Sequence, residues 1–492
     1  MEAIKVSISC ACRHAVRVTF AVRVTFAVSL LVAAGCAQIP RLNPPPVTKT
    51  AEQLGAARAF VAPAAAWPSD GWWRAYGDPQ LDALIQEALR DAPDLALAQA
   101  RQDAAAAAVQ FASATRIPQV TGGAALTEEK QSYNSLIPKQ ALPRGWTDYG
   151  LVSLDFSWEL DFWGKNRSAL AAAVSDQQAA GLEYAEARLL LSTSVAAGYA
   201  GLVDLYTLRD NAAETLRLRE ETVALFRRRH DFGLETLASV RQVEARRASA
   251  EADLRSYDER IALQDNAIAA LLGVGPDRGL TIARPSPHFT ASMGLPPNLA
   301  ADLLGRRPDI LAARSRAEAA AHRIDEKTAA FYPSVNLIAL VGVQSLGIRH
   351  LMSAGSQIGS AGPAVSLPIF NTRRLQGDLR GARAEYDASV ATYNATLSQA
   401  LREVADAATS RKALDGELTA ARAAVAAAAE AHQLVRNRYD GALATYLDVL
   451  EAEDELILAR RAQAALETRA LILDVSLVRA LGGGFAPDHP SI

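Results

Sequence analysis

The chain has very few cysteines, and all of them lie near its beginning. Only Cys10, Cys12 and Cys36 occur among its 492 residues. The rest of the chain can therefore form neither a disulfide nor a thiolate metal site. The seven histidines show no metal-ligand spacing, so we expect no metal and no cofactor.

A strong charge of either sign is also missing. The formal net charge is −3 and the isoelectric point is about 6.2, so we expect no nucleic-acid partner. We find no nucleophile elbow and no phosphate-binding loop, and the carboxylates are spread as on helix surfaces. We therefore expect no catalytic residue, and an enzyme is a weak second hypothesis.

Hydrophobic residues make up half of the chain, which is enough for a folded core. Alanine dominates them, and alanine favours helices that approach one another closely. Arginines precede an apolar run over residues 24–34, which is typical of an export signal rather than a spanning helix. We therefore assign residues 1–35 to a signal peptide.

Small residues precede Cys36, as they do in the lipobox of bacterial lipoproteins, although Ala33 stands where leucine is usual. This resemblance implies that Cys36 becomes the diacylated first residue. An aspartate directly after this cysteine commonly retains lipoproteins at the inner membrane, and here the residue is Ala37. The resemblance therefore also implies an outer-membrane location with a lipid anchor. The alternative is an ordinary cleaved signal with a bystander cysteine. The proline-rich residues 36–70 are interpreted as the lipidated tether.

The remaining chain is a duplication. Residues 92–95 (APDL) match 307–310 (RPDI), and residues 117–120 (IPQV) match 332–335 (YPSV) at the same offset. We place the first repeat at 71–275, a connection at 276–297, the second repeat at 298–484 and a tail at 485–492. Each repeat is predicted to contain a helix, two strands separated by a loop, and a pair of long helices.

Hydrophobic periodicity predicts where these elements lie. The longest helices would be about 100 Å long and must pack along their whole length, as in a coiled coil or helical barrel. Helices are predicted over about 79–115, 165–230, 234–272, 300–330, 373–439 and 443–481, and strands over about 118–127, 152–162, 333–344 and 357–369.

The strand over 152–162 alternates without a break, with apolar residues at even positions and polar ones at odd positions. Four strands cannot close a barrel without leaving edges, and a membrane sheet must close completely. A homotrimer would supply twelve strands. Asp155, Glu159 and Asp161 would then face a water-filled lumen.

At this point the layout resembles the TolC/OprM family of outer-membrane efflux proteins, in its lipoprotein branch. The resemblance implies a mixed α/β membrane protein: a homotrimer whose 12-stranded outer-membrane β-barrel continues into a long periplasmic α-helical barrel. The motifs that carry it are 70–73 (DGWW), 78–81 (DPQL), 160–164 (LDFWG), 306–310 (RRPDI), 331–333 (FYP), 438–439 (RY) and 446–450 (YLDVL).

The resemblance also implies a function and partners. The trimer would be the passive exit duct of a tripartite efflux system, extending from the outer membrane into the periplasm. Its partners would be outer-membrane lipid, a periplasmic adaptor (membrane fusion protein) and an inner-membrane proton-driven pump. The sequence does not identify the cargo, the cognate adaptor or the resting state of the channel.

Asp448 and Glu451 are three residues apart and share one helical face. Three copies would give a ring of six carboxylates that attracts cations and stores repulsion in a closed gate. The family match places Asp448, Glu451 and Tyr439 in the periplasmic gate. The alternative is a solvated acidic helix face.

The tight turns between the long helices are predicted to be the adaptor-docking tips. The first contains Gly233, Leu234 and Thr236, although a glycine there could simply supply a left-handed residue. In the second turn the glycine comes one place early, and its residues are Gly441, Ala442 and Thr445.

A periplasmic coiled-coil adaptor or a structural lipoprotein is the stronger rival. An adaptor carries one hairpin flanked by β domains, whereas here two hairpins alternate with strands. The sequence therefore favours the duct.

Overall fold

The computed structural model describes residues 38–55, 66–134, 136, 138–285, 299–441 and 443–486. It contains two compact units, which are described separately. One comprises residues up to 46, 104–177 and 315–390, and the other comprises 47–103, 178–314 and 391–492. The predicted signal peptide and Cys36 lie outside the described residues.

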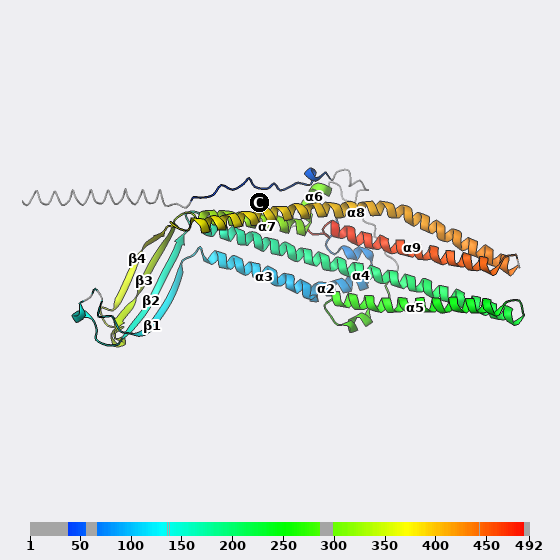
Figure 1. The fold of residues 1–492 in the computed structure, drawn as a ribbon, viewed down its shortest axis with the longest axis horizontal. Helices are drawn as coiled ribbons and strands as arrows, with labels where there is room; N and C mark the ends of the chain where they lie inside the picture. The colour runs from blue at the N-terminus through cyan, green and yellow to red at the C-terminus, as the bar shows by residue number, and fades with distance from the viewer. Residues whose placement is uncertain are drawn as a thin grey trace, which may run out of the picture. The chain divides into compact units, whose positions relative to one another are not determined.

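The same order of elements occurs twice along the chain (Figure 1). In each half, short helices precede a strand pair, and a pair of long helices follows. The first half contains α2 (Pro79–Asp91), α3 (Pro93–Ala114), β1 (Gln119–Glu129), β2 (Thr147–Leu160), α4 (Lys165–Asp231) and α5 (Leu237–Leu271). The second contains α6 (Leu299–Arg306), α7 (Pro308–Ala329), β3 (Ser334–Leu346), β4 (Gln357–Ser366), α8 (Thr372–Asp440) and α9 (Tyr446–Ala480).

Two predicted helices are each broken by a proline, which is a correction to the sequence analysis. Ala92, just before Pro93, is extended with ψ 130°, because the proline ring disfavours a helical conformation in the preceding residue. In the second half α6 ends at Arg306 and α7 starts at Pro308. The two prolines that align the repeats therefore also divide the helices.

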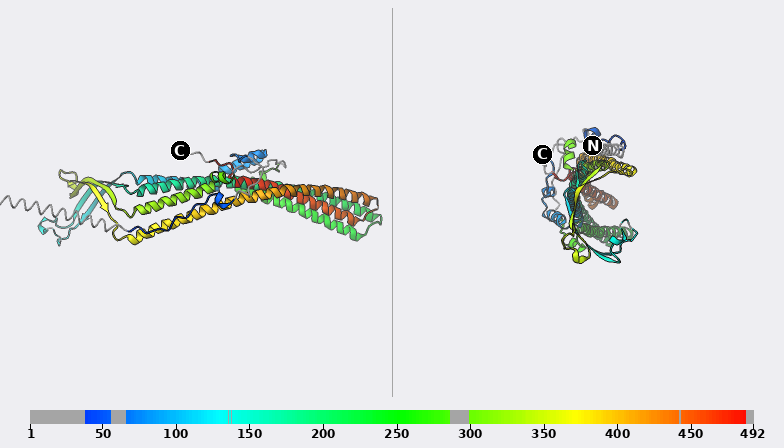
Figure 2. Two further views of the ribbon diagram at one scale, coloured as in Figure 1. Left: turned by 90° about the horizontal axis from the view of Figure 1, so that it is seen from above. Right: turned by 90° about the vertical axis from the view of Figure 1, so that its left-hand side faces the viewer.

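The four strands form one antiparallel sheet in the order β1-β2-β3-β4 (Figure 1, with two further views of the ribbon in Figure 2). Val152 lies opposite Ala124 of β1 and Val343 of β3. A Cβ at Gly342 would be 2.2 Å from the carbonyl oxygen of Val152. The close approach of β2 and β3 therefore requires glycine at this position.

The long helices α4 and α8 contain 67 and 69 residues, so each is about 100 Å long. One 18-residue stretch of α4 is apolar enough to cross a membrane, but 56% of it is buried inside the chain. In the second unit a core of buried side chains surrounds α4. Tyr199 of α4 donates a 2.8 Å hydrogen bond to Asp78, the N-cap of α2.

A run of three glycines follows α9. Gly482, Gly483 and Gly484 all have positive φ, at 85°, 59° and 84°. A Cβ on Gly482 would lie 2.1 Å from the carbonyl oxygen of Arg306. Only glycine fits such a left-handed, closely packed segment.

Candidate functional site

One face of the sheet is apolar and exposed, and this is the first candidate functional surface. Leu154 and Phe156 of β2 lie on it beside Val341 of β3, and Leu154 is 54% exposed although it is a large apolar side chain. A shallow apolar groove crosses this face. Its lining includes Val120, Leu154, Phe156, Ala339, Val341, Gly359 and Ala361 from all four strands.

On the opposite face β2 is polar, whereas the neighbouring β3 contributes Leu340 and Ile338 there. Ser153 is buried and donates a 2.8 Å hydrogen bond to Asp155, and Glu159 lies on the same face farther along β2. Asp155 and Ser157 on this face are exposed, as is Leu154 on the apolar face, so neither face of β2 is fully covered within the described residues. The predicted lumen positions Asp155 and Glu159 therefore share one face, and their role stays a prediction.

Asp161 has a different position from the one predicted. β2 ends at Leu160, so the strand does not continue to Phe162 as the alternation suggested. The Asp161 carboxylate accepts hydrogen bonds from the backbone N–H groups of Asn166 at 3.1 Å and Arg167 at 2.8 Å. It thus neutralises the N-terminus of α4, where unpaired N–H groups favour an anion.

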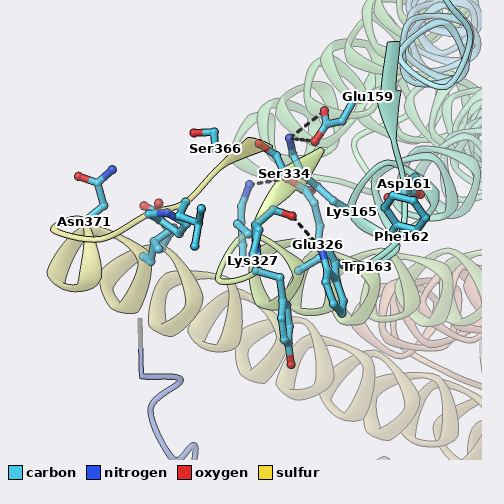
Figure 3. A pocket seen from close by; sticks show the side chains of 18 of the residues that line it. Glu159, Asp161, Phe162, Trp163, Lys165, Glu326, Lys327, Ser334, Ser366 and Asn371 are labelled. Atoms are coloured by element: carbon cyan, nitrogen blue, oxygen red, sulfur yellow. Dashed lines mark hydrogen bonds and ion pairs between the residues drawn. The ribbon is translucent and has the colours of Figure 1, made fainter. Parts of the chain in front are cut away.

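A pocket of about 400 Å³ lies at the helix side of the sheet (Figure 3). Lys165 forms an ion pair with Glu159 at 3.1 Å, and Lys327 pairs with Glu326 at 2.7 Å. The ring of Trp163 stacks on Tyr332 with centroids 4.7 Å apart. Charge is therefore balanced locally at this end of the sheet.

Both outer edges of the sheet are open within the described residues. β1 and β4 each pair with one neighbour, and all eleven residues of β1 are exposed. A strand exposed on both faces and along one edge is not stable by itself. Within the described residues the sheet therefore has two edges whose backbone groups are unpaired.

The first hairpin tip joins α4 to α5. Gly233 has φ 72°, and its N–H donates to His230, while the N–H of Leu234 donates to Arg229, both at 2.8 Å. These two bonds form a Schellman motif. Thr236 is the N-cap of α5 and accepts a 3.1 Å bond from the backbone of Ser239.

The second tip joins α8 to α9 and repeats one of these bonds. The N–H of Leu443 donates to the carbonyl of Arg438 at 2.8 Å, as Leu234 does in the first tip. Gly441, which comes one place earlier than the glycine of the first turn, is not among the glycines with positive φ. Ala442 lies outside the described residues. Exposed leucines occur at both tips.

Thr445 and Asp448 form a capping box at the start of α9. Asp448 accepts from the backbone N–H and the hydroxyl of Thr445, both at 2.7 Å, and its own N–H donates to Thr445 Oγ1 at 3.3 Å. The side-chain hydrogen bond from Thr445 lowers the pKa of Asp448. Asp448 thus stays ionised at neutral pH and stabilises its helix in addition to any role in a gate.

Glu451 lies one turn farther along α9 and is exposed. Nothing in the described part of the chain forms an ion pair or hydrogen bond with it. The two predicted gate carboxylates therefore differ, because Asp448 is engaged by its own helix and Glu451 is open to solvent.

A buried ionic cluster links the two hairpins and was missed by the sequence analysis. Arg219 of α4 lies 3.3 Å from Glu453 of α9 and also pairs with Asp454. Arg246 of α5 reaches Asp454 at 3.0 Å. Arg219 and Glu453 are almost fully buried, and burial raises the pKa of Glu453.

Aromatic side chains lie between this cluster and the tips. The ring of Tyr446 contacts Phe226 with centroids 3.9 Å apart, and it lies 6.2 Å from Tyr439. The Arg229 guanidinium stacks over Tyr439 at 5.0 Å, a cation–π contact. Tyr439, a predicted gate residue, is thus bound to α4 of the first hairpin.

The segment of residues 38–49, which precedes α2, runs along α8. Gln376 Nε2 donates to the carbonyl oxygen of Gln38 at 3.0 Å, and Leu42 packs against a cluster of Phe331, Leu375 and Leu379. In the other unit the Asn394 side chain accepts from Lys49 N–H at 2.8 Å. No group of three potential metal ligands occurs in the residues that the structure describes.

The comparisons with known proteins agree on one family. The model of the family described as "Outer membrane efflux protein" matches residues 84–274 and 299–483, one segment in each half. The chain is 36% identical to the fusaric acid resistance protein FusA of Burkholderia cepacia over 72% of its length and 68% of the relative.

Two further matches span more of the chain. It is 30% identical to the probable efflux pump outer membrane protein TtgC of Pseudomonas putida, over 92% of its length and 94% of the relative. Among solved structures, the outer membrane protein VceC of Vibrio cholerae has a TM-score of 0.81 at 46% identity, covering 85% of this chain and all of that one.

Proposed function

The chain belongs to the outer membrane efflux protein family, and from this premise we propose that three copies form an outer-membrane exit duct. The sheets would close into one 12-stranded barrel, and the long helices would form a tunnel in the periplasm. The observation that carries the proposal is the sheet itself, with its exposed apolar face and two open edges.

The dimensions of the sheet support a membrane location. The eleven residues of β1 extend over about 36 Å, which is about 26 Å along the membrane normal at a tilt of 45°. This equals the apolar band of a transmembrane barrel, about 25 Å tall. Closing β1 of one copy against β4 of the next would also satisfy the open backbone groups, which lipid cannot do.

The efflux role follows from the family, and the tripartite arrangement is part of the proposal. A periplasmic adaptor would contact the tips, where Leu234 and Leu443 expose apolar side chains, and an inner-membrane pump would supply the cargo. FusA is named for fusaric acid resistance, so a small aromatic acid is a reasonable first cargo to test.

We also propose that Cys36 is lipidated. Gln38, two residues later, is bonded to the second turn of α8 through Gln376. In the same unit α8 starts shortly after β4 ends. A lipid on Cys36 would therefore enter the bilayer near the helix side of the sheet. Mass spectrometry of the purified protein tests this, since a residue without acyl chains would contradict it.

The gate proposal concerns Asp448 and Glu451 and is tested by single-channel conductance in planar bilayers. Wild-type protein should give a small, cation-selective conductance. Glu451→Gln, which leaves the capping box intact, should weaken the selectivity, and adding Asp448→Asn should weaken it further and raise the conductance.

A matched control separates charge from helix capping. Thr445→Ala loosens the cap but keeps both carboxylates. If Thr445→Ala raises the conductance as much as the double variant does, Asp448 acts through its helix and the charged ring is wrong. A complete lack of conductance in verified insertions would overturn the proposed duct and favour the alternative, a periplasmic coiled-coil adaptor.

A further inference from the structure

Two loops lie at the end of the sheet farthest from the helices that precede and follow the strands (Figure 1). Residues 130–146 join β1 to β2, and residues 347–356 join β3 to β4. Together they contain Lys130, Lys139, Arg144, Arg349 and His350 but neither aspartate nor glutamate. This is unusual in a chain with 54 acidic residues and a net charge of −3.

Hydrogen bonds fix the β3–β4 loop to the start of β2, which directly follows the β1–β2 loop. Asp148, near the start of β2, accepts from the N–H of Gly347 at 2.7 Å through its carbonyl and from the N–H of Ile348 at 2.6 Å through its carboxylate. Gly145 donates to the Tyr133 hydroxyl at 3.0 Å. The β3–β4 loop is therefore fixed beside the β1–β2 loop.

These bonds bring cations from both loops to one end of the sheet. Lys130, Arg144 and Arg349 are exposed, and none forms an ion pair within the described residues. Three carboxylates, of Glu128, Glu129 and Asp148, lie at the adjoining strand ends, but in the part of the chain that the structure describes none forms an ion pair with these cations. Asp148 is engaged by backbone groups, and Glu129 accepts from Gln131.

The opposite end of the same sheet is built differently. There Lys165, Lys327 and Arg374 each pair with a carboxylate within 3.1 Å. At that end Arg116 and Arg373 are exposed without an ion pair, so among the described residues the loop end differs from it in having three unpaired cations and no paired one. Large apolar side chains are exposed in the same loops, namely Leu136, Trp146, Ile348 and Met352.

We propose that this loop surface, formed by Lys130, Arg144 and Arg349 with the exposed Leu136 and Trp146, binds a phosphorylated, acylated glycolipid of the outer leaflet. The inference rests on the proposed duct, which places the loop end outside the cell. Cations without protein partners suit phosphate groups, and adjacent apolar side chains suit acyl chains. Charge complementarity therefore favours this occupant.

The test uses the full-length protein in detergent micelles with fluorescent bis-phosphorylated lipid A as the probe. Each Lys or Arg near an anionic lipid surface contributes about fivefold in affinity, so removing three should cost about 100-fold. We expect this loss in the variant Lys130→Ala with Arg144→Ala and Arg349→Ala. Binding to wild type should also weaken as salt increases.

Two controls accompany that variant. Arg101, Arg380 and Lys412 are exposed helix residues, and alanine at all three removes the same charge elsewhere. This control should lose less than about threefold, since cations outside the contact contribute little. Exchanging lysine and arginine within the loop surface should preserve binding, because the charge is kept.

Three results would overturn the proposal: unchanged affinity in the loop variant, equal binding of dephosphorylated lipid A, or an equal loss in the helix control. Altered ion selectivity of the channel with unchanged lipid binding would mean that the cations line the exit instead. Measuring the conductance of the same preparation separates a failure of this inference from a failure of the proposed duct. A conducting protein that does not bind the lipid contradicts only this inference, whereas a non-conducting one contradicts the duct.

Discussion

Replacing Arg219 by methionine should destabilise the contact between the two hairpins. Arg219 is 8% exposed and contacts Glu453, which is 3% exposed, at 3.3 Å. Removing one partner of a buried ion pair costs about 3–5 kcal/mol, because the other charge stays buried. Asp454 keeps Arg246 at 3.0 Å and is half exposed, so the cost arises mainly from Glu453.

The loss should depend on pH. Burial raises the pKa of Glu453 above its ordinary value of 4.5, so the folded protein binds this proton more tightly than the unfolded chain does. The stability that this tighter proton binding provides is fully present below pH 4.5 and is lost as the pH rises through the raised pKa of Glu453. Arg219 lowers that pKa, so its removal should make the variant lose more stability than wild type as the pH rises above 4.5.

Thermal unfolding of the detergent-purified protein, followed by circular dichroism, measures both effects. Arg227→Met is the matched control, since its ion pair with Glu244 is exposed and should contribute at most about 1 kcal/mol. Adding Glu453→Leu to Arg219→Met should restore stability, because it removes the unpaired charge. If the Arg219 and Arg227 variants melted at the same temperature both below pH 4.5 and at neutral pH, the reasoning would be refuted.

Three further predictions concern the sheet and the second unit. Gly342→Val should abolish trimers on gels, because its Cβ would lie 2.2 Å from a carbonyl oxygen of the facing strand, whereas Gly362→Val, with no atom within 4 Å, should retain them. Phe156→Arg should cost about 2–4 kcal/mol at the centre of the bilayer and reduce outer-membrane assembly, while Ser157→Arg on the opposite face should assemble normally. Burial raises the pKa of Glu186 to about 7, so its contribution to stability is lost as the pH rises from 4.5 through about 7, and Glu186→Gln should flatten the melting temperature over that range; an unchanged slope would contradict the assignment.

Local patterns predicted much of the fold. The start of α4 at Lys165 and the return of a strand pair before α8 follow from hydrophobic periodicity, which depends only on neighbouring residues. The apolar face of β2 was predicted for the same reason. Its end was not, because Asp161 has a second use as a hydrogen-bond acceptor for α4, and alternation cannot distinguish that use from a strand position.

The candidate site was predicted less completely. Thr445 and Asp448 form a capping box with the three-residue spacing that the sequence contains, so this signal was available. Arg219 and Asp454 are 235 positions apart, and nothing local indicates that they meet. Such pairings depend on how the hairpins pack, which the periodicity of each helix does not determine.

The central claim is that the open sheet is one third of a closed barrel, and cysteine cross-linking across the seam tests it most directly. The chain after Cys36 has no cysteine, so a cysteine at Gly122 of β1 can be combined in turn with one at Gly359, Ala361 or Val365 of β4. We predict that one combination, oxidised in intact outer membranes, gives a covalent trimer on non-reducing gels. Failure of every combination to cross-link, or cross-linking that yields only dimers, would contradict the account.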